Sequence, residues 1–320
     1  MKPNFLYRLA TFLARPAAYI YFKKRNTPPD WVRNLKGPAI MASNHPNSFF
    51  DTVVQGAMMK EPGHTVVRGD VFKKGLLRKI FNGLHMIPAY RGNDGGREHV
   101  LKNDELFELC RKTLKNNGII YFYPEGLCVH EYKLRPLKKG LARVAMQAFL
   151  DPELKDKLRI IPTGLNYTSF AGPGKSLEMV YDKPITIADI GEPSMDAASL
   201  NRFNVLLESR MKPLTWQEEK VMKLHRDTPM LLRVLLFAPA LLGWLCNAPF
   251  YYPLKRLAAK LNQGSVFYDS MLFGFLILLY PLYYLLFAGL LCFFLPCLTA
   301  FATALTLPLW GWCAVRVFKQ

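Results

Sequence analysis

Hydrophobic and polar positions divide the chain into a first part built from short alternating elements and a last part built from long apolar tracts. Between Gly37 and about Asp189, short runs rich in apolar and β-branched residues alternate with stretches of helical periodicity. This alternation is typical of an α/β domain with a largely parallel sheet flanked by helices. The predicted strands lie at 38–43, 64–68, 86–90, 119–123, 159–166 and 177–187. The predicted helices lie at 50–60, 72–83, 97–116 and 137–150.

The segments on either side of this domain have other patterns. Residues 3–25 place aromatic and aliphatic side chains at near-helical spacing, with arginines and lysines between and after them. They predict an amphipathic helix, bent at Pro16, that either lies at a membrane interface or packs on the domain. Residues 195–229 predict one or two polar surface helices. We therefore expect an N-terminal helix and linker at 1–35, the α/β domain at 36–195, a polar helical connector at 196–230 and a membrane-embedded region at 231–320.

The last tract carries the strongest membrane signal, because residues 271–315 contain no charged side chain. A transmembrane helix needs about 20 apolar residues, so this tract predicts a hairpin of two hydrophobic transmembrane helices with a break near Pro296. Residues 234–252 are also apolar, but Pro239 and Asn247 are among the residues that interrupt them. For this earlier segment we expect a re-entrant or surface-lying course rather than a full crossing of the bilayer.

Charge and cysteine usage narrow the class of protein. The chain has 320 residues, 51% of them hydrophobic, and a formal net charge of +18. This excess implies anionic partners: nucleic acid, acidic lipid or phosphorylated, CoA-like substrates. No nucleic-acid-binding motif is present and the aromatic residues concentrate in the apolar tail, so we expect no nucleic-acid partner. The six cysteines lack metal-ligand spacing and favour a reduced, cytoplasm-facing protein.

Candidate chemistry lies where the first predicted strand ends. His45 follows the apolar run 38–42, and Asp51 stands one short turn later, with Asn47 or Ser48 as the expected N-cap of the next helix. A histidine oriented by a carboxylate can take a proton from a hydroxyl, which then attacks a carbonyl. The structural alternative is a capping box in which Asp51 bonds back to the backbone of Ser48.

Three further clusters follow predicted strands. Arg91 comes after the strand 86–90, where its guanidinium suits two phosphate oxygens, although a solvated arginine is the simpler alternative. Glu125 and Gly126 come after the strand 119–123 and predict either a site carboxylate or a structural salt bridge. The basic run 133–139 suits phosphates or is a solvated surface, and the third cluster, at Ile160–Gly164, is expected to wall a pocket.

Taken together, these clusters resemble the four ordered blocks of the glycerolipid acyltransferase family over roughly residues 36–190. The blocks are Asn44-His45 to Asp51, Ile87–Arg91, Tyr123–Gly126 and Ile161–Thr163. Two departures stand out. Five residues separate His45 from Asp51 where the family has four, and Leu127-Cys128 replace the Thr or Ser, and often Arg, that continue the third block. We assign Cys128 no nucleophilic role, because no base is spaced to activate it.

The resemblance implies acyl transfer in phospholipid biosynthesis, from acyl-CoA or acyl-carrier protein to a hydroxyl of glycerol 3-phosphate or 1-acylglycerol 3-phosphate. His45 is then the expected general base and Asp51 its orienting carboxylate, while Arg91 clamps the acceptor phosphate and Glu125 with Gly126 shapes the acceptor site. Backbone donors at the following helix start are expected to stabilise the oxyanion.

The same resemblance sets the expected partners. We expect no metal and no cofactor beyond the acyl carrier, because a thioester is already activated. Anionic membrane lipid is the expected surface partner, with the catalytic domain on the cytoplasmic face of the membrane, where short Lys- and Arg-rich loops stay. The alternatives are a phospholipid hydrolase or remodelling enzyme and a catalytically silent membrane scaffold.

Overall fold

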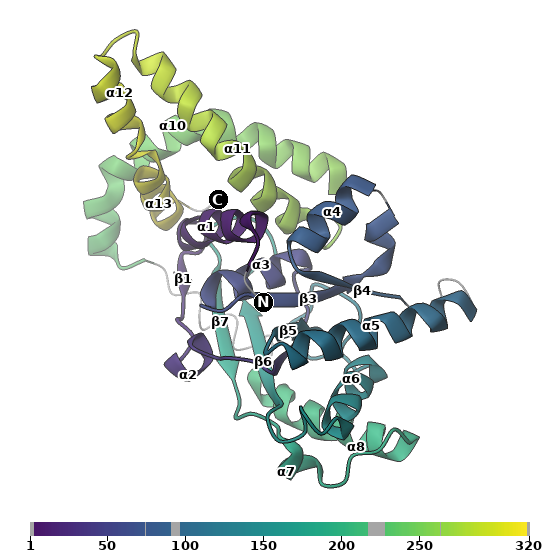
Figure 1. Ribbon diagram of the computed structural model, residues 1–320. Coiled ribbons are helices and arrows are strands. Elements are labelled where there is room, and N and C mark those ends of the chain that lie inside the picture. Colours follow the sequence, from purple (N-terminus) through teal and green to yellow (C-terminus); the bar gives the residue numbers. More distant parts are fainter. Residues whose placement is uncertain (1–2, 74, 91–96, 217–227, 263, 319–320) are drawn as a thin grey trace.

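The protein is described by a computed structural model that covers residues 3–73, 75–90, 97–216, 228–262 and 264–318 (Figure 1). Its centre is a seven-stranded sheet in the order β1-β7-β6-β2-β5-β3-β4. All neighbouring strands run parallel except β6 and β7, which are antiparallel, so the predicted largely parallel sheet is confirmed. The strands are β1 (Lys24–Arg25), β2 (Ala39–Ser43), β3 (Gly63–Arg68), β4 (Met86–Ala89), β5 (Ile119–Phe122), β6 (Arg159–Tyr167) and β7 (Ser176–Tyr181).

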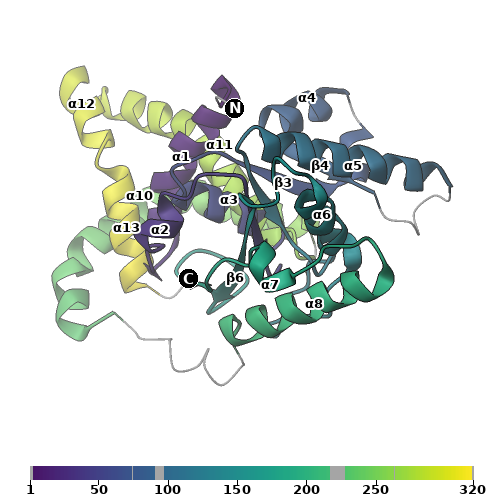
Figure 2. The ribbon, with the colours of Figure 1, turned by 60° about the horizontal axis from the view of Figure 1, so that its bottom comes forward.

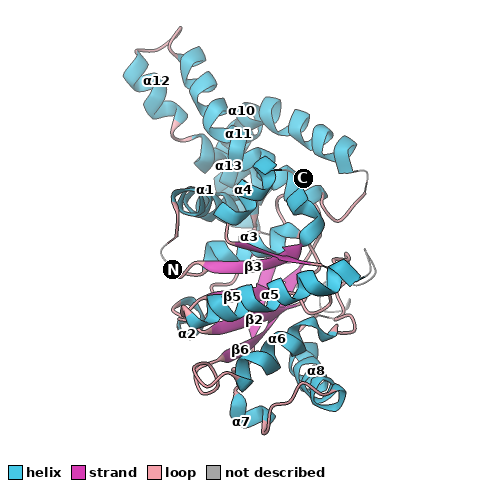
Figure 3. Ribbon diagram, turned by 45° about the vertical axis from the view of Figure 1, so that its right-hand side comes forward, coloured by secondary structure: helices cyan, strands magenta, loops and turns pink. Residues whose placement is uncertain are grey.

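Helices cover both faces of the sheet and make three layers (Figure 3). The side chains of the central strand β2 explain this, because all five of its residues are buried. Ile40 and Ala42 pack with one layer of helices, whereas Ala39 and Met41 lie in a separate cluster on the other face. The first layer contains α5 (Arg97–Lys115), α6 (Lys139–Leu150) and α8 (Ala197–Met211), and the second contains α1 (Phe5–Tyr21), α3 (Phe49–Met58) and α4 (Gly75–Gly83).

Parallel pairing brings the turns with candidate chemistry to one edge of the sheet. In β2, Ala42 pairs with Phe122 of β5, and Ser43 pairs with Thr163 of β6. The carboxyl ends of β2 and β5 therefore lie side by side, and each leads into a turn. In open α/β sheets, ligands bind beyond such strand ends.

The element boundaries differ from the sequence prediction by one or two residues at several ends, and by more in two places. The strand predicted at 177–187 is too long, because β7 ends at Tyr181 and only Ile185 forms a further isolated bridge, to Ile160. Pro184 lies between them, and proline has no N–H to donate to a ladder. The helix predicted at 72–83 is divided into a 3₁₀ turn, Gly69–Lys73, and α4.

The amphipathic helix α1 packs on the domain, one of the two alternatives for residues 3–25, and its place at a membrane interface stays a prediction. Its Ala14, Ala18 and Tyr21 are buried, and Ala18 and Tyr21 belong to the core cluster that includes α3. Phe5 and Phe12, by contrast, are 80% and 74% exposed. One side of α1 therefore packs on the domain, and the outer side presents aromatic rings of the kind that enter a membrane interface.

The chain ends in four helices: α10 (Met230–Asn262), α11 (Tyr268–Leu291), α12 (Cys297–Ala304) and α13 (Leu307–Val317) (Figures 1 and 2). Pro296 caps α12, so the predicted break is confirmed. Within the described residues, three segments are long and apolar enough to cross a membrane: Met230–Asn262, Tyr268–Leu291 and Cys297–Val317. Many of their large side chains are exposed, including Leu282 and Leu298. An uncovered apolar surface of this kind indicates membrane association.

The interruption expected within 234–252 does not occur, because α10 continues through Pro239, Pro249 and Pro253. Asn247 explains part of this continuity. Its side-chain amide donates to the Gly243 carbonyl at 2.8 Å, and its oxygen accepts from the Tyr280 hydroxyl of α11 at 3.1 Å. The polar group is thus satisfied within the helices. The re-entrant loop is therefore wrong, whereas a surface-lying course of this helix stays a prediction.

Candidate active site

His45 lies on the turn between β2 and α3, and its side chain is paired with Asp51. The imidazole Nδ1 is 2.9 Å from the Asp51 Oδ2. The five intervening residues do not separate the two groups, because Ser48 adopts a φ of 54° immediately before α3. This left-handed conformation tightens the turn and brings the first turn of α3 back toward the histidine. The extra residue of the block is therefore absorbed, as the pairing requires.

The Asp51 carboxylate is fully buried and accepts from three donors. Besides His45, the Asn47 backbone N–H donates to Oδ2 at 2.9 Å, and the Tyr167 hydroxyl of β6 donates to Oδ1 at 2.8 Å. The capping-box alternative is wrong, because the Ser48 N–H donates to the Cys128 sulfur at 2.8 Å rather than to Asp51. Asp51 therefore stabilises the turn through Asn47 and orients the His45 ring.

The imidazole of His45 is fixed in plane as well as in position. Its ring stacks on Tyr123, with centroids 4.0 Å apart and an interplanar angle of 16°. The Tyr123 hydroxyl is itself held at 2.9 Å by Thr52 and at 3.0 Å by Gln55. Since a carboxylate only accepts, Nδ1 carries the hydrogen and Nε2 keeps its lone pair. The His45 side chain is 20% exposed. This is the arrangement of a general base.

Glu125 stands on the turn after β5, next to the His45 turn. It is only 4% exposed, and burial raises the pKa of its carboxyl group to about 7. Backbone N–H groups of His45 and Arg135 donate to it, the latter at 3.4 Å, and partly offset this rise in pKa. Gly126 follows with a φ of 68°, a conformation that favours glycine. Within the described residues Glu125 has no ion pair.

Other residues singled out by the sequence divide into three cases. Arg91 lies outside the described residues, so its expected phosphate contact stays a prediction. Thr163 is fully buried, and its hydroxyl donates to the Ile161 carbonyl at 3.2 Å, which makes it part of the sheet interior. In the basic run, Arg135 pairs with Glu131 at 3.1 Å.

Cys128 and the backbone N–H groups at the start of α3 form hydrogen bonds within the fold. Burial, followed by the nearby Asp51, raises the pKa of the Cys128 thiol, so this group stays protonated and is a poor nucleophile. The expected oxyanion donors are largely engaged, because the N–H groups of Asn47 and Ser48 bond to Asp51 and Cys128, and that of Phe50 donates to the Ser270 hydroxyl at 2.9 Å. These three donors are therefore not available to an oxyanion.

Sequence reasoning missed a second buried carboxylate, Asp269, on the first turn of α11. Asp269 is fully buried and accepts from the Asn47 side chain at 2.9 Å and from the Gly172 N–H at 2.9 Å. It also accepts from the Tyr21 hydroxyl and pairs with the buried Lys175. An isolated acid at the edge of an uncharged apolar tract was the available signal, because such residues are usually functional or paired.

Lys175 joins this second carboxylate to the first. Its ammonium lies over the rings of Phe50 and Tyr167, 4.5 and 5.1 Å from their centroids. Burial lowers the pKa of Lys175, and Asp269 opposes that decrease. Because Tyr167 donates to Asp51 and Asn47 contacts both carboxylates, the turn that carries His45 is held between Asp51 and Asp269.

We expect Glu125→Gln to remove a pH-dependent loss of stability. The carboxyl has a pKa of about 7 when folded and 4.5 as its ordinary value, so ionisation favours the unfolded chain as pH rises from 4.5 through 7. At 1.36 kcal/mol per pKa unit this is a loss of about 3 kcal/mol, absent from the glutamine variant. Thermal melting in detergent at pH 5 and pH 8 measures it. A constant difference in melting temperature between native protein and variant across this range would contradict the burial argument.

Asp269→Asn should destabilise the protein by roughly 3–5 kcal/mol, because it leaves the buried Lys175 ammonium without its carboxylate. Lys175→Met in the same chain is expected to recover part of this loss by removing the unpaired charge. Thermal melting of the two single variants and the double variant measures the coupling between the two side chains. Additive losses would show that the ion pair does not stabilise the fold.

Part of the chain matches a known protein family. Residues 17–166 match the family model described as Acyltransferase, a segment that includes His45, Asp51 and Glu125. No curated protein sequence gives a significant match. Among solved structures, the chain is similar to the 1-acyl-sn-glycerophosphate (LPA) acyltransferase PlsC from Thermotoga maritima, with 13% sequence identity and a TM-score of 0.46, over 70% of this chain and 81% of that one. Residues 17–166 therefore match the Acyltransferase family, which agrees with the resemblance of the sequence blocks to the glycerolipid acyltransferases.

Proposed function

We propose that this membrane-associated acyltransferase moves a fatty acyl group from the thioester of acyl-CoA or acyl-carrier protein to a hydroxyl of a glycerol phosphate. The observation that carries the proposal is the 2.9 Å contact between His45 and Asp51 within the matched family segment. The acceptor is glycerol 3-phosphate or 1-acylglycerol 3-phosphate, which places the reaction in phospholipid biosynthesis. The net charge of +18 suits the phosphates of both substrates.

The reaction follows from the state of the imidazole. Nε2 of His45 takes the proton of the acceptor hydroxyl while Asp51 stabilises the imidazolium that forms. The acceptor oxygen bonds to the thioester carbonyl carbon, and collapse of the tetrahedral intermediate breaks the carbon–sulfur bond. The proton held by His45 passes to the departing thiolate. Atoms and charge balance without a metal or redox cofactor, and the products are an ester and a free thiol.

Three residues form the acceptor side of the proposed site. Arg91 follows β4 and clamps the acceptor phosphate through its forked guanidinium. Glu125, which receives the backbone N–H of His45 and has a pKa near 7, can present a protonated carboxyl to an acceptor oxygen at neutral pH. Gly126 lets the substrate approach the backbone closely.

His45→Ala is expected to lower the acyl-transfer rate about 10²- to 10⁴-fold, because it removes the general base. Asp51→Asn should also reduce the rate severely, since the amide offers one acceptor where the carboxylate serves three donors. Release of free thiol from acyl-CoA, with and without glycerol 3-phosphate, measures transfer and separates it from hydrolysis, which needs no acceptor. His64→Ala, at a buried histidine of β3 outside the dyad, is the matched histidine control. Near-native turnover of the His45 variant would end this mechanism.

We also propose that the acyltransferase domain faces the cytoplasm, where its acyl donors are found. The connection between α10 and α11 lies on the same side as this domain, because His130 bonds to the Val266 backbone. The sequence 253–260 at the end of α10 includes Lys255, Arg256 and Lys260, and short cationic segments stay in the cytoplasm.

A cysteine introduced by Ser265→Cys tests this orientation. An impermeant thiol reagent should label it in permeabilised cells and leave it unlabelled in intact cells, with the native chain and its own six cysteines as the control. Labelling from outside intact cells would contradict the orientation and leave the chemistry at His45 unaffected.

A further inference from the structure

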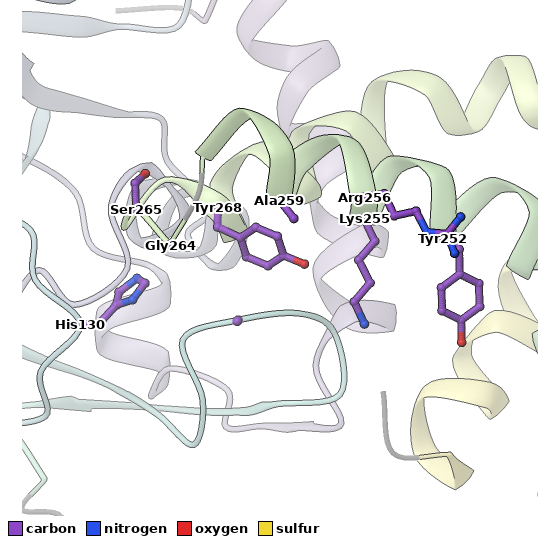
Figure 4. A pocket seen from close by; sticks show the side chains of 9 residues that line it. His130, Tyr252, Lys255, Arg256, Ala259, Gly264, Ser265 and Tyr268 are labelled. Carbon is purple, nitrogen blue, oxygen red and sulfur yellow. The ribbon is translucent and has the colours of Figure 1, made fainter.

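A cavity of about 630 Å³ lies where the end of α10 and the start of α11 meet the acyltransferase domain (Figure 4). Residues of α10 and α11 line it together with His130 and Ala171 of the domain. None of the residues assigned above to acyl transfer lines this cavity. The side chains that bear on its chemistry are Tyr252, Lys255 and Arg256 of α10, Tyr268 of α11 and His130 of the domain.

The cavity offers positive charge that no carboxylate balances. Lys255 and Arg256 line it, and none of the lining residues is an aspartate or glutamate. Neither cation forms an ion pair within the described part of the chain. The Lys255 ammonium lies over the rings of Tyr251 and Tyr252, 5.5 and 6.0 Å from their centroids. Two adjacent cations without a carboxylate suit the oxygens of a phosphate.

His130 supplies a further polar group from the opposite side. Its ring stacks on Phe170 with centroids 5.0 Å apart, and one ring nitrogen bonds to the Val266 backbone. The other, Nε2, is buried with no hydrogen-bond partner among the described residues. A buried polar atom without a partner is uncommon, and a ligand oxygen in the cavity would supply one.

The position of the cavity selects a lipid rather than a free anion. Residues 230–249 of α10 include a single charged side chain, Arg233, whereas Lys255, Arg256 and Lys260 follow on its last turns. α11 begins beside that cationic end and continues as an uncharged apolar helix from Met271. A boundary between apolar and cationic residues is typical of the depth of lipid headgroups, where phosphates are found.

The cavity also shares a wall with the support of the catalytic pair. Tyr268 lines the cavity, and the next residue, Asp269, accepts from the Asn47 side chain. Ala171 lines it as well, and the next residue, Gly172, donates to Asp269. A molecule in the cavity therefore lies against the residues that hold the His45 turn.

We propose that this cavity binds the phosphate headgroup of a glycerophospholipid drawn from the membrane. Lys255 and Arg256 contact the phosphate, His130 contacts a headgroup oxygen, and the tyrosine rings border the start of the acyl chains. Two sources carry this chemistry: the acyl acceptor, held here before its phosphate reaches Arg91, and an anionic phospholipid of the bilayer that acts on the site. Binding does not depend on acyl transfer, whereas the identity of the lipid as the acceptor rests on the function proposed above.

Binding is tested on the full chain in non-ionic detergent, in a His45→Ala background that cannot turn over. Calorimetric titration with dioctanoyl phosphatidic acid should show binding, and dioctanoylglycerol, which lacks the phosphate, should bind at least tenfold more weakly. The double variant Lys255→Gln with Arg256→Gln should bind phosphatidic acid at least about tenfold more weakly, the effect of losing a charge-assisted contact. Lys260→Gln, on the same helix and outside the cavity lining, is the matched control. Equal affinities in the double variant and the control would overturn the proposal.

Acyl-transfer kinetics with the native His45 distinguish the two sources. A raised KM for 1-acylglycerol 3-phosphate in the Lys255 and Arg256 double variant, with kcat little changed, identifies the acceptor. An unchanged KM with loss of stimulation by phosphatidic acid in phosphatidylcholine vesicles identifies a bilayer lipid. If the double variant and the Lys260→Gln control have the same KM and the same stimulation by phosphatidic acid, the cavity has no part in lipid recognition and the proposal fails. Absence of transfer by the native protein would contradict the proposed function. The calorimetric titration would still show whether the cavity binds a phospholipid headgroup.

Discussion

The structure of this site depends on the burial of the Asp51 carboxylate. A charge withdrawn from water is tolerated only when its oxygens are hydrogen-bonded, and Asp51 receives donors from a histidine, a backbone N–H and a tyrosine on β6. Each donor must be in place for the carboxylate to remain buried. The requirement therefore fixes the turn after β2, the ring orientation of His45 and the position of β6 at the same time.

Much of this could be predicted from the sequence, because it depends on local patterns. Apolar runs such as Ile119–Phe122 predicted the central strands, since strands buried on both faces read as continuous apolar segments. The spacing of His45 and Asp51 suggested their pairing, but not whether the extra residue was tolerated. That depended on the left-handed backbone of Ser48, and serine does not ordinarily signal a positive φ.

The parts that were missed depend on contacts between distant segments. Asn47 and Asp269 are 222 positions apart, and nothing in the local sequence of either residue indicates the other. The two-residue strand β1 is formed only because β7 offers it an edge, and α10 stays helical through its prolines partly because Tyr280 satisfies Asn247. In each case tertiary partners determine what the local pattern leaves open.

The Asp269 contacts also explain why the apolar helices and the acyltransferase domain form one working unit. Asp269 is on the first turn of α11, and it bonds to Asn47, whose N–H holds the Asp51 carboxylate. Removing α11 would leave Lys175 buried without a counter-charge and Asn47 without its side-chain partner. The turn that carries His45 would then lose its support on one side. The geometry of the His45–Asp51 pair therefore depends on the docking of a helix apolar enough to cross a membrane.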